Sequence, residues 1–200
     1  MNLSKKECTE LQIKEAARRL FFVEGKINAT TQEIGDAAGV NRTLINYYFR
    51  SRDELFKQVY QEARAEIVGR IQSAFQAPLP IREKTAHIID VFSDYILKEP
   101  YTELFMIAEI NNFQHTIDIE KTPSKAKIDD FLTEIEQGIR DGVVRPMVPL
   151  NFIINLFALI THPLLLKPLY LELYNLNEET FSNLFQNRKE MILTLLFEQQ

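Results

Sequence analysis

The chain of 200 residues is 46% hydrophobic, which excludes a disordered protein and allows a sizeable core. It has only 6 glycines and 8 prolines, a scarcity that favours long helices over many short strands. Its single cysteine, Cys8, excludes a disulfide framework, and with no visible secretory signal we expect a cytoplasmic protein. A redox role for Cys8 is the alternative to an inert thiol.

The net charge of −5 is divided unevenly along the chain. Residues 1–60 have 10 basic and 8 acidic side chains, a charge of +2, whereas residues 61–200 have 13 and 20, a charge of −7. This asymmetry indicates an N-terminal part that faces a polyanion and an acidic remainder with another task.

The first predicted helix ends near Gly25. Its apolar stripe consists of Ile13, Ala16, Ala17, Leu20 and Phe21. Thr30 and Glu33 have the spacing of a capping box, which predicts the start of a short second helix. Gly39 is expected to end that helix in a left-handed conformation.

A third helix is predicted over residues 42–49, with Asn41 as its cap. Ser51 is expected to cap a fourth helix that extends to about Phe75, and Asp53 and Glu54 suit the dipole at its start.

The remaining sequence predicts further helices. We expect them at about 82–98, 101–114, 123–140, 150–161 and 178–197. Pro163 and Pro168 are expected to interrupt the chain between the last two. The uncharged run 146–166 is long enough to span a bilayer, but its asparagines, histidine and prolines favour a buried helix instead.

The segment 32–49 meets the requirements of a helix-turn-helix. The second helix has small residues, Gly35 and Ala38, where the third helix must cross it. Gly39 makes the turn and Val40 fills it. Two side chains of the third helix are expected to pack back against the second; these are Ile45 and Tyr48.

Outward positions of the third helix have side chains that read DNA. Arginine recognises guanine and asparagine recognises adenine in the major groove, whereas hydroxyl and guanidinium groups bind phosphates. The predicted DNA-binding residues are Thr31, Asn41, Arg42, Thr43, Asn46, Tyr47, Tyr48, Arg50 and Arg52. The alternative is a helix with ordinary solvated polar residues.

Three runs of this region, 13–25, 30–40 and 46–56, resemble the N-terminal domain of the tetracycline-repressor (TetR) family. The resemblance implies that Thr31 contacts phosphate, that Arg42 and Thr43 read bases, and that Tyr47, Tyr48 and Arg52 contact the DNA backbone. Two positions depart from the family pattern: Gly35 replaces a frequent alanine and Asn46 a frequent tyrosine. The operator therefore does not follow from better-known members.

The resemblance also implies an all-α fold, with a helix-turn-helix domain at 1–52 and an effector-binding and dimerisation domain at 53–200. We expect a homodimeric repressor that binds palindromic operator DNA and is released by an apolar or aromatic effector, because ligand binding shifts the helix at 52–75. The predicted effector-binding residues are Phe92, Tyr95, Phe105, Met106, Ile110, Phe113 and His115. The predicted dimer interface consists of Phe152, Ile153, Leu156, Phe157, Ile160, Leu184, Phe185, Arg188, Ile192 and Leu195.

Rival functions are less well supported by the sequence. The histidines at 87, 115 and 162 lack metal-ligand spacing, and no nucleophile elbow or phosphate loop is present, so we expect neither an enzyme nor a metal or cofactor. A constitutive DNA-binding dimer without a ligand shares every feature of the first 60 residues and stays open, as does an activator.

Overall fold

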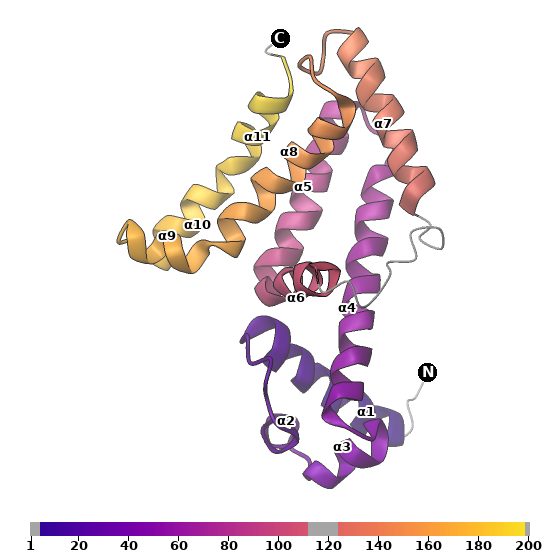
Figure 1. The fold of residues 1–200 in the computed structure, drawn as a ribbon, viewed down its shortest axis with the longest axis vertical. Coiled ribbons are helices and arrows are strands. Elements are labelled where there is room, and N and C mark those ends of the chain that lie inside the picture. Colours follow the sequence, from indigo (N-terminus) through magenta and orange to yellow (C-terminus); the bar gives the residue numbers. More distant parts are fainter. Residues whose placement is uncertain (1–4, 112–123, 199–200) are drawn as a thin grey trace. The chain divides into compact units, whose positions relative to one another are not determined.

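The computed structural model describes residues 5–111 and 124–198, and its elements there are helices (Figure 1). The only β pairing in these ranges is one isolated bridge between Val144 and Phe197. The all-α expectation is confirmed.

The chain divides into two compact units. The first consists of Met1–Glu66 and Lys98–Asn111, and the second of Ile67–Leu97 and Asn112–Gln200. The domain boundary expected at residue 52 therefore falls inside the first unit, and a later helix joins that unit.

The first unit contains the helix-turn-helix. Its elements are α1 (Lys5–Arg18), the π-helical turn η1 (Arg19–Val23), α2 (Thr31–Ala38), α3 (Arg42–Phe49), the first part of α4 (Arg52–Phe75) and α6 (Pro100–Asn111). In η1 the Glu24 N–H donates to the Arg19 carbonyl oxygen at 3.0 Å. This wider turn accompanies three consecutive buried residues, Leu20, Phe21 and Phe22, a run that an amphipathic α-helix does not place on one face.

Helix α6 completes the core of the first unit. The Phe105 ring centroid lies 5.8 Å from that of Phe22 and 5.7 Å from that of Phe56. The Tyr101 ring covers Gly25, where an added Cβ would lie 2.6 Å from a ring carbon. Gly25 also has φ of +69°, so both its conformation and its lack of a side chain are required.

The second unit is a separate helical core. Its elements are the rest of α4, α5 (Ile81–Lys98), α7 (Ser124–Arg140), α8 (Pro149–Leu165), α9 (Lys167–Leu173), α10 (Glu178–Gln186) and α11 (Arg188–Leu196). Its largest fully buried side chains are Phe131, Phe152 and Phe197, followed by Ile67, Ile88 and Ile96. A buried Lys84 Nζ contacts Glu134 at 2.6 Å and joins α5 to α7.

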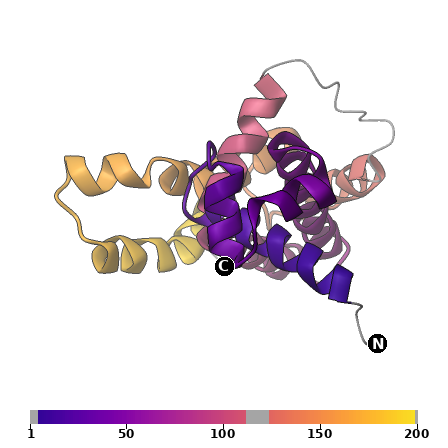
Figure 2. The same cartoon turned by 90° about the horizontal axis from the view of Figure 1, so that it is seen from below.

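The C-terminal helices form a long hairpin, in which α10 and α11 return along α9 and α8 (Figure 2). Pro163 does not end α8, which continues to Leu165. The expected single last helix is divided at Asn187. No single helix in the described part of the chain is long and apolar enough to cross a membrane; α8 and α9 pass the length and composition test only together, with a 59° bend between them.

Candidate DNA-binding site

The predicted capping box at the start of α2 is present. Thr30 Oγ1 accepts from the Glu33 N–H at 3.2 Å, and the Thr30 N–H donates to Glu33 Oε2 at 2.8 Å. The hydrogen bond from the Thr30 backbone lowers the pKa of Glu33. These bonds satisfy N–H groups that helix geometry leaves without partners, and they hold the first helix of the motif in place.

The turn between α2 and α3 depends on two glycines. Gly39 has φ of +66° and its N–H donates to the Asp36 carbonyl oxygen at 3.2 Å, as expected for a left-handed helix end. At Gly35, an added Cβ would lie 2.9 Å from the Val40 carbonyl oxygen. The departure from the family's frequent alanine therefore allows the turn to approach α2 closely.

Helix α3 begins at the predicted cap. Asn41 Oδ1 accepts from the Thr43 N–H and from Thr43 Oγ1, both at 2.9 Å. Ile45 and Phe49 are buried and fix the inner face of the helix. Asn41 and Thr43 thus help to start α3, which constrains how both side chains are presented.

The opposite face of α3 is exposed. Arg42, Thr43, Asn46 and Tyr47 are all exposed, with Tyr47 at 70%, whereas Tyr48 is half-buried. Exposed guanidinium, amide and hydroxyl groups on a short helix of a helix-turn-helix match what major-groove recognition requires. The face has the right chemistry, while the role of each residue on DNA stays a prediction.

Arg50 ends α3 in an unusual backbone conformation. Its φ is +67° and its ψ is −43°, and its N–H donates to the Asn46 carbonyl oxygen at 3.0 Å. L-residues rarely adopt this region, and such strain concentrates at functional sites. The side chain is exposed, at the edge of the proposed DNA-contacting surface.

Arg52 occupies a more structural position than its expected phosphate contact requires. The guanidinium carbon lies 5.1 Å from the Phe21 ring centroid and 5.3 Å from that of Phe56. Its Nε donates to the Ala29 carbonyl oxygen at 3.3 Å, and its Nη1 contacts Asp53 at 3.1 Å. Arg52 therefore fastens the start of α4 to the core, and a phosphate role stays a prediction.

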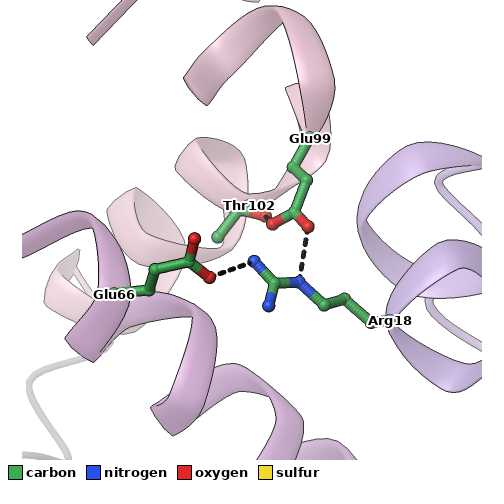
Figure 3. A network of polar contacts seen from close by, with 4 residues as sticks. All are labelled: Arg18, Glu66, Glu99 and Thr102. Carbon is green, nitrogen blue, oxygen red and sulfur yellow. Dashed lines mark hydrogen bonds and ion pairs between the residues drawn. The ribbon is translucent and has the colours of Figure 1, made fainter. Parts of the chain in front are cut away.

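A polar network that the sequence reasoning missed joins three helices of the first unit (Figure 3). Arg18 Nε, on α1, donates to Glu99 Oε1 at 2.5 Å, and Arg18 Nη2 donates to Glu66 Oε2, on α4, at 2.8 Å. Glu99 directly precedes α6, and Thr102 Oγ1 lies 3.4 Å from Glu99 Oε2. Partners 48 and 81 residues apart leave no local sequence signal.

The predicted effector-binding residues do not form one group in the structure. Phe92 and Tyr95 are buried in the core of the second unit, and Phe105 and Met106 are half-buried in the first. The Ile110 side chain, Phe113 and His115 lie outside the described residues.

The predicted dimer-interface residues fall into two classes. Phe152, Leu156, Ile160, Phe185 and Ile192 are buried within the chain's own core, so they have little surface left for a partner. Ile153, Phe157 and Arg188 are half-buried, and Leu184 and Leu195 are more than half exposed. For these five buried residues, the helical spacing that suggested an interface arises from packing within the monomer. No cluster of three potential metal ligands occurs among residues 5–111 and 124–198.

Comparison with known proteins identifies the family. A model of the tetR family of bacterial regulatory proteins matches residues 13–59, which include the capping box, the turn and α3. Residues 13–59 are therefore a TetR-family DNA-binding domain. Members of that family are DNA-binding transcriptional regulators rather than enzymes, in agreement with the sequence-based expectation.

Individual TetR-family relatives are distant. The regulator AcrR of Shigella flexneri is 30% identical over 88 residues, which cover 41% of this chain but only 40% of AcrR. The repressor NicS of Pseudomonas putida is 25% identical over 179 residues, or 88% of this chain and 79% of NicS. The TetR-family regulator PfmR of Thermus thermophilus superposes with a TM-score of 0.61 at 14% identity, over 96% of this chain and 97% of PfmR, which shows the fold alone.

Proposed function

We propose that this TetR-family protein is a homodimeric repressor that binds a palindromic operator and is released by a small molecule. The observation that carries the proposal is the exposed face of α3, where Arg42, Thr43, Asn46 and Tyr47 are held by a capped helix start and a buried inner face. The proposal includes a cytoplasmic location, because operator DNA is found there.

The small size of the reading surface favours a dimer. One eight-residue helix contacts only a few base pairs, and two-fold dimers of helix-turn-helix proteins place their recognition helices about 34–36 Å apart, in successive major grooves. The C-terminal hairpin offers an apolar face for this contact. Its exposed members outside the hairpin's cavity are Leu150 and Ile154 on α8 and Leu195 on α11. Two copies of such a face form an isologous interface, typically a four-helix arrangement.

Release by ligand requires a connection between the two units, and the chain supplies several covalent ones. Helix α4 begins in the first unit and ends in the second, and α6 belongs to the first unit while α5 and α7 belong mainly to the second. The hydrogen bonds of Arg18 tie α6 and α4 to α1. A ligand that displaces α4 or α6 would change the presentation of α3, and operator would weaken ligand binding reciprocally.

A salt-titrated binding assay against the DNA upstream of the protein's own gene tests the first part of the proposal. We expect tight binding that weakens steeply with salt. Arg42→Ala should reduce discrimination against altered operators by about 1–3 kcal/mol. Arg140→Ala, which removes one exposed positive charge from α7, is the matched control and should leave discrimination intact.

Ligand release is tested separately by screening small molecules against the preformed DNA complex. Loss of operator affinity with a saturating compound supports a ligand-responsive repressor. If every compound that binds the protein leaves operator affinity unchanged, the protein is a constitutive regulator, the second candidate from the sequence.

A further inference from the structure

The C-terminal hairpin has an open cavity of about 730 Å³ on its surface, a volume in the range of small-molecule sites. Its wall is mostly apolar. The aromatic contributors are Tyr170, Tyr174, Phe181 and Phe185, and Pro163 and Met191 are among the others. The rings of Tyr170 and Tyr174 are stacked, with centroids 6.0 Å apart and planes 17° apart, and a planar ligand can stack on an aromatic ring in the same way.

Arg188 also lines this cavity, and Pro163 explains its position. In an α-helix the carbonyl oxygen of residue 159 accepts from the N–H of residue 163, but Pro163 has no N–H. Arg188 Nη2 donates to the Leu159 carbonyl oxygen at 2.9 Å instead. One nitrogen of the guanidinium is thus fixed by a gap in α8, and the rest of the group is held at the cavity wall.

The charge of Arg188 is not neutralised within the described residues. No carboxylate among them forms an ion pair with it, and its Nε is buried without a hydrogen-bond partner. By contrast, the two lysines nearest to Arg188 in the sequence both form ion pairs: Lys167 Nζ lies 2.5 Å from Glu178, and Lys189 Nζ lies 2.6 Å from Asp90. Burial lowers the pKa of Arg188, the effect of a cation that lacks a counter-ion.

A second polar group faces the same region. Tyr170 Oη lies 3.4 Å from His162 Nδ1, at the edge of the aromatic wall. The cavity is thus apolar over most of its surface, with a phenolic hydroxyl and a guanidinium among its lining groups. A buried donor without a partner, as Arg188 Nε is, is costly, so an acceptor that reaches it is stabilised.

We propose that this cavity binds an organic carboxylate with a flat, apolar body, whose anionic end is held by Arg188. An arginine fork and a carboxylate are geometrically matched, and their hydrogen bonds are among the stronger ones in proteins. The site assigns a chemical class to the effector of the proposed function. Only the regulatory consequence of ligand binding rests on that function. It lies apart from Phe92 and Tyr95, which the sequence suggested as effector contacts.

The test compares 1-naphthylacetate with its neutral amide, 1-naphthylacetamide, as probes of the full-length protein without DNA. Their fluorescence is read without tryptophan background, because the chain has no tryptophan. We expect the acid to bind roughly ten- to a hundredfold more tightly than the amide, the gain typical of a charge-assisted hydrogen bond.

Arg188→Met alone would leave the Leu159 carbonyl without a donor and risks unfolding. The matched pair is therefore Pro163→Ala, which restores the helical N–H, and the double variant Pro163→Ala with Arg188→Met. Because Pro163 also lines the cavity, the two variants are compared by the ratio of acid to amide affinity and not by affinity itself. The single variant keeps the guanidinium and should keep a preference for the acid, and the double variant should lose it while remaining folded by circular dichroism.

Three results would overturn the proposal: equal affinity of acid and amide in the wild-type protein, no binding of either, or a preference that survives in the double variant. Sedimentation of the same samples detects the competing arrangement, in which a partner copy's carboxylate pairs with Arg188. In that case the double variant dissociates and the acid does not bind. Acid binding without release of DNA would support the site and count against its regulatory role.

Discussion

At the scale of single residues, the most informative position in the DNA-binding unit is Arg50, whose backbone is in a region that favours glycine. Ordinary residues in such regions cost of the order of 1–3 kcal/mol, and this cost persists where the side chain serves a purpose. We therefore predict that the exposed guanidinium of Arg50, at the end of α3, binds a DNA phosphate.

Arg50→Gly should therefore raise the free energy of unfolding by roughly 1 kcal/mol while it weakens DNA binding and lowers the salt dependence by about one counter-ion. Urea denaturation and a salt-titrated binding assay measure the two effects. Arg50→Ala is the control, because it removes the same charge but keeps the strain. A stability gain in both variants, or in neither, would contradict the strain argument.

Glu103 is a second residue in an unfavourable environment, in this case a buried carboxyl group. It is 7% exposed on α6, its Oε2 has no hydrogen-bond partner in the part of the chain described, and burial raises its pKa to about 7 from 4.5. The folded protein therefore binds a proton between these two pH values that the unfolded chain does not. The stabilisation is complete below pH 4.5 and is lost as the pH rises through 7.

We expect this loss to reach roughly 3 kcal/mol, the equivalent of the raised pKa. Glu103→Gln should remove it, so the variant should be more stable than the wild-type protein at pH 8 and differ little at pH 5. Chemical denaturation at both pH values measures the difference. The matched control is Glu83→Gln, the same change at an exposed position of α5. A wild-type pH dependence retained by Glu103→Gln would assign it to other groups.

At the scale of elements, the sequence predicts best what is decided locally. The capping box of Thr30, the left-handed Gly39 and the cap at Asn41 each depend on neighbours within a few residues, and all three are confirmed. Ser51 Oγ likewise accepts from the Glu54 N–H at 3.1 Å. These local signals were sufficient to predict the helix-turn-helix from the sequence, and that motif in turn indicated the family.

What the sequence did not predict depends on distant partners. Helix propensity places a break at Pro163, but Arg188 satisfies the freed carbonyl and α8 continues. The allocation of α6 to the first unit follows from Tyr101 and Phe105, whose partners are more than 40 residues away. Buried faces of α8 and α11 have the same spacing whether they meet a partner or their own core, so the pattern alone cannot separate these cases.

The contact between α1, α4 and α6 gives a prediction at this scale. Arg18→Gln should lower the free energy of unfolding by about 1–3 kcal/mol, because it removes charge-assisted hydrogen bonds to Glu66 and Glu99 that are partly shielded from water. Arg19→Gln is the control, the same change at the next position. The Arg19 side chain is 57% exposed, and its Nε contacts Glu24 Oε1 at the longer distance of 3.6 Å. Equal losses in both variants would show that the network adds nothing beyond general charge.

At the scale of the whole molecule, the proposed repressor depends on two copies acting together. Ile154, 53% exposed on α8, lies on the apolar face proposed for the dimer. Ile154→Glu should give a monomer in sedimentation experiments and reduce operator affinity by roughly a hundredfold or more, because each half-site is then bound independently. Leu79→Glu, an exposed leucine in the loop before α5, is the control. A dimeric Ile154→Glu variant would place the interface elsewhere.

The inclusion of α6 in the first unit has a consequence for engineering hybrid regulators. A chimaera that joined residues 1–66 to another C-terminal region would discard Glu99, Tyr101 and Phe105, and with them part of the core that supports the reading helix. The segment 98–111 must therefore be transplanted together with the N-terminal one. Operator preference in this chain is better redesigned by exchanging side chains on the exposed face of α3 than by exchanging an N-terminal cassette.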